Sequence, residues 1–240
     1  MKKVILVTGG NGRFAKILRK KNKILNLKFF GKDELNILNL KSIEKNIIKY
    51  NPKIILHCAG LSRPMDIHDK NIKKSIDLNI IGTANLVKMC KKYNIKIIYF
   101  STGYIYEGKK GNYSESDPVK PFNNYAISKL GGECSVLMYK NSLILRITMT
   151  EKPFSYKKAY TNLFSNFMYH EDVVKILPYL INEFGIINVG GKSQSIYKFA
   201  KNSNNKIKKS KLNKNLKIPF KQTMNLSLLN KILGRNKKII

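Results

Sequence analysis

The sequence predicts an α/β protein in which a doubly wound parallel sheet carries a small C-terminal lobe. Short β-branched apolar runs alternate with longer segments of helical period, which is the typical pattern of βαβ units and a parallel sheet. A glycine-rich turn directly follows the first of these runs. The chain has 240 residues, of which 43% are hydrophobic, so it can bury a sizeable core.

Six short apolar runs are the expected strands: Val4–Val7, Leu27–Phe30, Ile54–Cys58, Ile97–Phe100, Leu143–Leu145 and Ile186–Val189. The segments between them have apolar residues at three- and four-residue spacing, which predicts helices. The expected helices are Arg13–Asn22, Leu40–Tyr50, Asn71–Tyr93 and roughly Asn124–Tyr139. In the third of these, Ile72, Ile76 and Ile80 fall on one face.

The segment 103–123 is rich in Gly, Ser, Asn, Asp and Pro, which predicts a long loop. Loops of this length in compact domains usually carry function. After Arg146 the alternating pattern weakens. We therefore expect residues 1–146 to form the main domain, to which residues 168–190 return with one strand. Residues 147–167 and 191–240 are expected to form the small substrate-binding lobe.

The glycine-rich turn predicts a Rossmann-type dinucleotide site. Gly9, Gly12 and Ala15 form a G-x-x-G-x-x-A frame between the first strand and the first helix. Glycine lets the backbone turn tightly and approach a pyrophosphate, and the helix N-terminus offers free N–H groups to the phosphate oxygens. We expect Gly9, Gly12, Arg13 and Phe14 to contact the cofactor. The competing interpretation is a tight turn that binds nothing.

The end of the second strand bears on which cofactor is bound. NAD-binding chains commonly place an acidic residue there to hold the ribose hydroxyls. Here the strand runs into Gly31, Lys32 and Asp33. Lys32 and Arg13 would neutralise a 2′-phosphate, which weakly favours NADP over NAD. Both side chains are equally compatible with solvated surface charges.

Thr102, Tyr125 and Lys129 are the expected catalytic residues. Tyr125 and Lys129 are four residues apart on an expected helix and therefore share a face. A phenol titrates near ~10, and lowering that pKa to ~7 requires roughly 4 kcal/mol, which Lys129 and an oxidised nicotinamide together would supply. Thr102 ends a parallel strand, where ligands bind in such sheets, and its hydroxyl would orient a carbonyl.

With these motifs in this order, the chain resembles the extended short-chain dehydrogenases, and most closely their dTDP-4-dehydrorhamnose reductase branch. The segments that carry the resemblance are Thr8–Ala15, Leu35–Ile37, His57–Gly60, Asp77–Thr83, Tyr113–Glu115, Pro118, His170–Val173 and Leu226–Leu228. The resemblance implies that Tyr125 donates a proton to a sugar carbonyl, that Lys129 holds the nicotinamide ribose and that Thr102 polarises the carbonyl.

The resemblance also implies further contacts. Cofactor contacts are expected from Asn36, Ile37, Cys58, Ala59, Gly60 and Asn79. Substrate contacts are expected from Gly103, Tyr104 and Arg146. The implied function is NAD(P)H-dependent reduction of a keto group on a nucleotide-linked sugar, as part of carbohydrate biosynthesis. The chain departs from the family in having Asn36 for a usual Asp, Gly103 for a usual Asp and no Trp.

Two rival enzyme classes are disfavoured. Related 4,6-dehydratases resemble this fold but need an Asp-Glu pair after the catalytic Thr, where this chain has Gly103 and Tyr104. Enzymes that epimerise beside the carbonyl use a Cys near this position, where the chain has none. Simple reduction and 4-epimerisation with retained cofactor remain. A non-catalytic NADP-binding regulatory subunit is the alternative outside enzymes.

Composition limits the partners. The formal net charge is +32, yet only five of the 46 basic residues are arginines, whereas specific nucleic-acid readers rely on arginine. No specific nucleic-acid partner is therefore expected.

Three cysteines without paired spacing predict reduced thiols, and no metal site is expected. No apolar run is long enough for a membrane span, and no signal peptide is apparent, so we expect a cytoplasmic protein. The oligomeric state is open, with a homodimer as one candidate.

Overall fold

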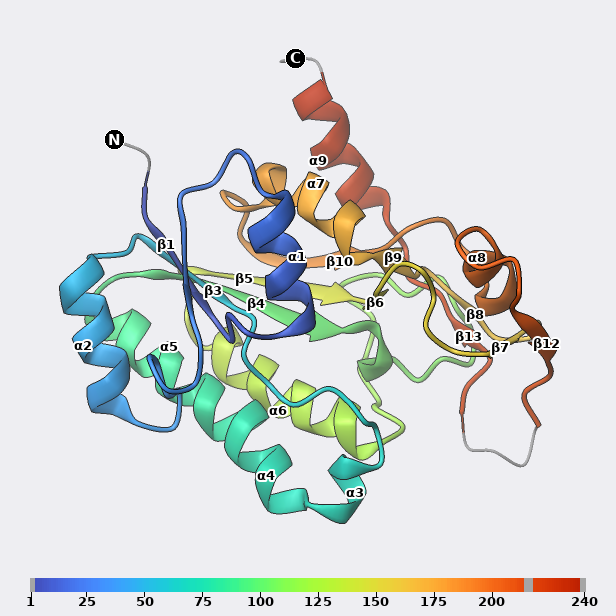
Figure 1. Cartoon of the computed structure of the whole chain (residues 1–240), viewed down its shortest axis with the longest axis horizontal. Coiled ribbons are helices and arrows are strands. Elements are labelled where there is room, and N and C mark those ends of the chain that lie inside the picture. Colours follow the sequence, from blue (N-terminus) through green and yellow to red (C-terminus); the bar gives the residue numbers. More distant parts are fainter. Residues whose placement is uncertain (1–2, 214–217, 238–240) are drawn as a thin grey trace.

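A six-stranded parallel sheet forms the centre of the computed structural model, which describes residues 3–213 and 218–237 (Figure 1). Its strand order is β10-β5-β4-β3-β1-β2. The strands are β1 (Ile5–Thr8), β2 (Leu27–Phe30), β3 (Ile54–His57), β4 (Lys96–Thr102), β5 (Ser142–Ile147) and β10 (Gly185–Val189). All six expected strands are present, and the predicted fold class is confirmed. The central strands are buried along their whole length, which explains why they consist of continuous apolar runs.

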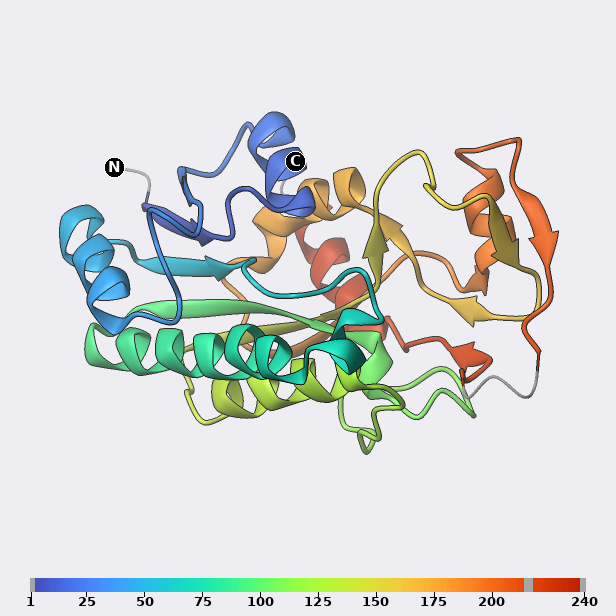
Figure 2. The same cartoon turned by 60° about the horizontal axis from the view of Figure 1, so that its bottom comes forward.

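Helices cover both faces of the sheet (Figures 1 and 2). One face carries α1 (Arg13–Lys21), α7 (His170–Leu180) and α9 (Ser227–Lys237). The other face carries α2 (Leu40–Tyr50), α5 (Gly82–Lys92) and α6 (Asn124–Leu137), and Figure 2 shows α5 and α6 side by side. Within the described residues, no helix combines the length and the apolar content that crossing a bilayer demands.

The expected long helix 71–93 consists of three pieces. A short helix α4 (Ile72–Ile76) leads into a π-helical turn η1 (Asp77–Ile81), which leads into α5. A further short helix, α3 (Ile67–Lys70), precedes them. The widened turn changes the helical phase, and Ile72 and Ile76 are 56% and 41% exposed. Helical spacing alone therefore describes this segment incompletely.

The lobe has a small core of its own. Its elements are β7 (Lys158–Tyr160), β8 (Phe164–Ser165), β11 (Gln194–Ser195), α8 (Ile196–Lys201), β12 (Lys208–Ser210) and β13 (Lys221–Gln222). Phe154, Leu163 and Phe199 are among the buried residues that hold these elements together. The paired strands β6 (Met149–Thr150) and β9 (Met168–Tyr169) lie where the chain leaves β5 and where it enters α7.

Helix α9 lies outside this lobe, although its residues fall within the range 191–240 expected for it. Leu229 and Ile232 are 2% and 1% exposed. They belong to the core on the face of the sheet that α1 and α7 cover, together with Leu177 of α7 and Val189 of β10. The physical reason is that the face of β10 and α7 needs an apolar cover, which α9 supplies.

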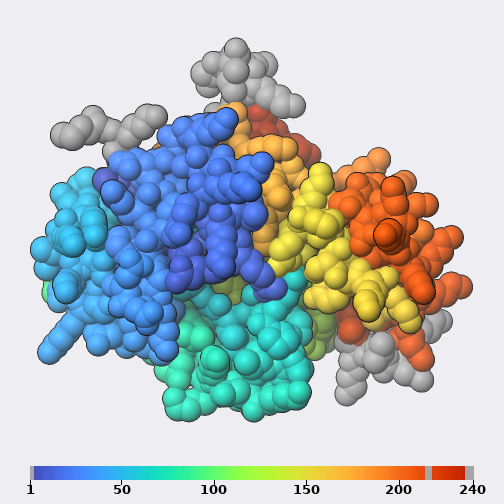
Figure 3. Space-filling view, viewed as in Figure 1, coloured from blue at the N-terminus to red at the C-terminus, as the bar shows by residue number. Residues whose placement is uncertain are grey.

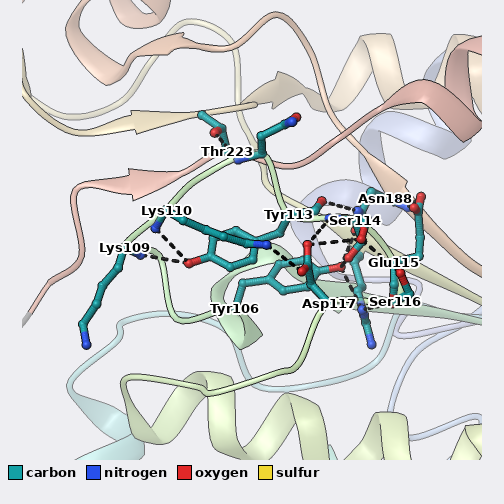
Figure 4. A network of polar contacts seen from close by, with 12 residues as sticks. Tyr106, Lys109, Lys110, Tyr113, Ser114, Glu115, Ser116, Asp117, Asn188 and Thr223 are labelled. Carbon is teal, nitrogen blue, oxygen red and sulfur yellow. Dashed lines mark hydrogen bonds and ion pairs between the residues drawn. The ribbon is translucent and has the colours of Figure 1, made fainter.

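The expected loop 103–123 is ordered by polar contacts (Figure 4). It begins with a 3₁₀ turn, η2 (Gly103–Ile105). The Tyr113 hydroxyl accepts hydrogen bonds from the backbone N–H groups of Lys109 and Lys110, at 2.9 and 3.2 Å. The Tyr113 backbone N–H donates to the carbonyl of Thr223 at 3.0 Å. The loop is thereby fixed against the segment that leads into α9.

Candidate active site

A cavity of about 900 Å³ opens at the carboxyl ends of the parallel strands and extends into the lobe. Its walls come from the turn after β1, the ends of β3, β4 and β5, the start of α6 and the apolar side of the lobe. Ligands of open α/β sheets bind at this edge. Its size is that of a site for a cofactor or a substantial organic ligand.

The glycine turn forms one end of the cavity. Gly9 has a φ of +66°, and a Cβ placed on it would come within 2.6 Å of the backbone of Ala59. This close approach requires glycine. Gly9, Gly12, Arg13 and Phe14 all line the cavity, opposite the segment formed by Cys58, Ala59 and Gly60. Seven of the residues expected to contact a cofactor are thus brought together, in a cradle that a side chain would fill.

The three expected catalytic residues also line this cavity. Thr102 is the last residue of β4, and Tyr125 and Lys129 lie one turn apart on α6. Asn123 caps that helix by accepting a hydrogen bond from the backbone N–H of Ala126 at 2.8 Å, which fixes where its first turn begins. The Thr102 hydroxyl is near enough to the Tyr125 phenol to lower its pKa.

Burial dominates the electrostatics of this group. It raises the pKa of Tyr125, and the Thr102 hydroxyl and the charges of Arg63 and Arg13 partly oppose that rise. Burial lowers the pKa of Lys129 to about 7. The Lys129 ammonium lies 4.0 Å from the centre of the Tyr99 ring. In the structure, the cations that act on the phenol are therefore the two arginines, a contribution that the sequence pattern did not predict.

Several residues expected in the site do not line the cavity. Lys32, Asn36, Ile37 and Gly103 are absent from its described walls, and so is Asn79. The Asn79 amide is fully used elsewhere: it accepts from the Leu61 backbone N–H at 2.7 Å and donates to the Ser128 hydroxyl at 2.8 Å. Asn79 thus holds the loop after β3 against α6. Tyr104, by contrast, lines the cavity as expected.

Arg146 lies away from the cavity, contrary to the expectation that it contacts substrate. Its side chain is buried, and its guanidinium donates to Glu133 at 2.7 and 3.1 Å and to the Tyr106 hydroxyl at 2.8 Å. Glu133 in turn accepts a short hydrogen bond from Ser101. Because a buried guanidinium must be paired, Arg146 serves as the counter-ion of Glu133 and does not face the cavity.

The structure adds residues that the motifs did not reveal. Arg63, in the loop after β3, and Glu151, just after β6, both line the cavity and form an ion pair. In the sequence, the only signal for Arg63 is that arginine is rare in this chain. Thr148, His170 and Gln222 also line the cavity, and each has a buried polar side-chain atom without a hydrogen-bond partner. Unpaired buried polar groups of this kind are typical of sites that a ligand completes.

Comparison with known proteins places this geometry in context. The model of the family described as "RmlD substrate binding domain" matches residues 1–176. The chain is 29% identical to methionine adenosyltransferase 2 subunit beta from Rattus norvegicus over 155 residues, which are 60% of this chain and 46% of that protein. It is also 29% identical to dTDP-4-dehydrorhamnose reductase from Aggregatibacter actinomycetemcomitans over 154 residues, which are 61% of this chain and 51% of that protein. The chain therefore spans about half the length of the curated relatives it matches.

Among solved structures, the chain is similar to a dTDP-4-dehydrorhamnose reductase from Bacillus anthracis in complex with NADP. The TM-score is 0.82 at 22% identity, and the match covers 96% of this chain and 92% of that one. At this identity the likeness shows a shared fold, which here extends over the lobe as well as the sheet.

Proposed function

This chain belongs to the family of the RmlD substrate binding domain, and from that premise we propose that it is an NAD(P)H-dependent oxidoreductase that reduces a keto group on a nucleotide-linked sugar. The family match confirms the resemblance that the motifs indicate. The observation that carries the proposal is the pair of hydroxyl groups on Thr102 and Tyr125, which line the same cavity as the glycine turn. A protein that only binds a cofactor has no need of this pair.

The chain's own residues would bind, orient and protonate. The backbone at Gly9 and Gly12 and the first turn of α1 would receive the cofactor pyrophosphate. Thr102 and Tyr125 would hold the substrate carbonyl oxygen between two hydroxyl groups, and Tyr125 would donate its proton to that oxygen as the carbonyl becomes an alcohol. Arg63 and Arg13, whose charges lower the pKa of the phenol, would stabilise the phenolate left behind, and Lys129 would add to this in its protonated form. When bound, the reduced nicotinamide supplies the hydride.

The cofactor is proposed to be NADP or NAD. The solved reductase from Bacillus anthracis contains NADP, which supports this class of cofactor. The weak preference for NADP rested on Lys32 together with Arg13. Arg13 instead pairs with Glu151 at 3.1 Å, and Lys32 does not line the cavity. The preference for NADP over NAD therefore stays a prediction, as do the cytoplasmic location and the homodimer.

The test is a reduction assay. We expect NADPH or NADH to be oxidised in the presence of a 4-keto sugar nucleotide, with one equivalent of the alcohol formed. Tyr125→Phe removes the proton donor and should lower kcat about 10² to 10⁴-fold while cofactor affinity is retained. Tyr93→Phe removes a phenol outside the cavity and serves as the matched control. Full turnover by Tyr125→Phe would contradict the mechanism.

The similarity to methionine adenosyltransferase 2 subunit beta favours a second candidate, a cofactor-binding regulatory subunit of another enzyme. The two candidates predict different outcomes for the same panel. A regulatory subunit would bind NADPH with normal affinity and oxidise none of it with any keto-sugar nucleotide. Epimerised sugar without net NADPH consumption would instead indicate the 4-epimerase.

A further inference from the structure

One carboxylate at the cavity wall is shared by two arginines. Glu151 Oε1 lies 3.1 Å from Arg13 Nε, and Glu151 Oε2 lies 2.9 Å from Arg63 Nη1. Hydroxyl groups complete the arrangement: Arg13 also donates to Ser62 at 3.3 Å, and Arg63 donates to Thr150 at 3.2 Å. All five residues line the cavity.

The three charged groups come from three separate segments. Arg13 opens α1 directly after the glycine turn, Arg63 lies in the loop after β3, and Glu151 follows β6 at the edge of the lobe. Figure 3 shows the segment around residue 150, in yellow, beside the N-terminal segment in dark blue and above the teal segment that follows β3. The ion pairs thus join the lobe to the nucleotide-binding half of the molecule.

Another anion can replace Glu151 in these ion pairs, because all three side chains are partly exposed. The Arg13, Arg63 and Glu151 side chains are 48%, 24% and 27% exposed, so water already competes for them. The local balance is two positive charges against one negative charge. A diphosphate carries more negative charge than a carboxylate and presents several oxygens, which suits two planar guanidinium groups.

We propose that Arg13 and Arg63 together form a diphosphate-binding site, which Glu151 occupies in the free protein and from which an incoming diphosphate displaces the carboxylate. This deepens the proposed function, because a dinucleotide cofactor and a nucleotide sugar both carry that group. Glu151 would then weaken binding and speed ligand release. Arg63 would contribute binding energy that the glycine turn alone does not provide.

The experiment measures binding to the full chain by calorimetry or fluorescence titration. NADH and UDP are the two diphosphate probes, and adenosine and uridine are their matched controls without phosphate. Glu151→Gln keeps the shape of the side chain and removes its charge. It should tighten diphosphate binding about fivefold. Arg63→Gln should weaken it about tenfold or more. Both effects should shrink as salt concentration rises.

The two probes distinguish whether the site binds the diphosphate of the cofactor or that of the nucleotide sugar. A change for NADH alone assigns the site to the cofactor, a change for UDP alone assigns it to the sugar nucleotide, and either supports the site. Glu183→Gln is the matched control, because Glu183 pairs with Arg235 at 3.5 Å outside the cavity. The proposal is overturned if Glu151→Gln weakens binding or leaves it unchanged, or if the nucleosides respond equally. Absence of turnover would overturn the reductase function but leave these binding results intact.

Discussion

At the scale of single residues, Lys129 occupies a buried position that lowers the stability of the fold. The residue is 8% exposed, and burial lowers its pKa from 10.5 to about 7. The unfolded chain therefore binds this proton more tightly than the folded chain. The destabilisation is complete below pH 7 and disappears as pH rises towards 10.5.

Lys129→Met tests this. The variant should be more stable than the parent by on the order of 3 kcal/mol at pH 6.5, since the desolvated charge is gone. The difference in the free energy of unfolding between the variant and the parent should narrow steadily between pH 7 and pH 10.5. Urea unfolding at several pH values measures it, and the same variant should lose reductase turnover. A gap that widens with pH would show that Lys129 is not destabilised by burial.

Arg146 makes the opposite prediction. Arg146→Met leaves the Glu133 carboxylate buried without its partner and should cost about 3 to 5 kcal/mol in the free energy of unfolding. Glu44→Gln, which breaks the more exposed pair with Lys92, should leave the free energy of unfolding nearly unchanged. If Arg146 instead contacted substrate, the variant would raise KM and leave the urea midpoint unchanged.

The sequence located the residues whose role depends on local spacing. Gly9, Thr102, Tyr125 and Lys129 lie at strand ends and helix starts, and the alternation of strands and helices puts these at one edge of the sheet. Arg63 and Glu151 could not be found in this way. They lie in loops far apart in the chain, and only the folded backbone brings their charges together.

At the scale of elements, the strands were predictable because each is buried on both faces and consists of an unbroken apolar run. The π-helical turn was not. Its extra residue breaks the helical period at Asp77–Ile81, where the neighbouring helix α6 packs closely against it. There, glycine permits a close approach: a Cβ on Gly132 would come within 2.4 Å of the Asn79 carbonyl oxygen.

Gly132→Ala should therefore destabilise the protein by about 3 kcal/mol, because neither backbone can move aside cheaply. It should also impair activity, since Asn79 positions the loop after β3. Gly234→Ala in α9 is the matched control: a Cβ there meets nothing within 4 Å, and higher helix propensity predicts a gain of up to about 1 kcal/mol. Equal stability of the two variants, measured by thermal and urea unfolding, would refute the close-packing argument.

At the scale of the whole molecule, charge is the dominant unusual property. The formal net charge is +32 on 240 residues. Folding brings these positive charges closer together, so their mutual repulsion destabilises the folded state. Salt screens such repulsion over about 10 Å at 0.1 M. The urea midpoint should therefore rise as NaCl increases from about 20 to 300 mM. Sucrose of equal osmolality controls for general solvent effects. A midpoint that falls with salt would show that attractive ion pairs dominate instead.

The packing of α9 on the sheet is the other global feature, and its contribution can be measured directly. Leu229→Ala removes a side chain that is 2% exposed and should cost about 2 to 5 kcal/mol. Leu228→Ala, at a neighbouring position that is 38% exposed, should cost less than about 1 kcal/mol. Equal losses in urea unfolding would place α9 outside the cooperative core.

The position of α9 has a consequence for how the protein is made. Leu229 and Ile232 are translated after nearly everything they contact, yet they cover the sheet face formed by β10 and α7. A nascent chain on the ribosome therefore presents an uncovered apolar surface until α9 has emerged. Until then, that surface is available to chaperones and to other unfinished chains.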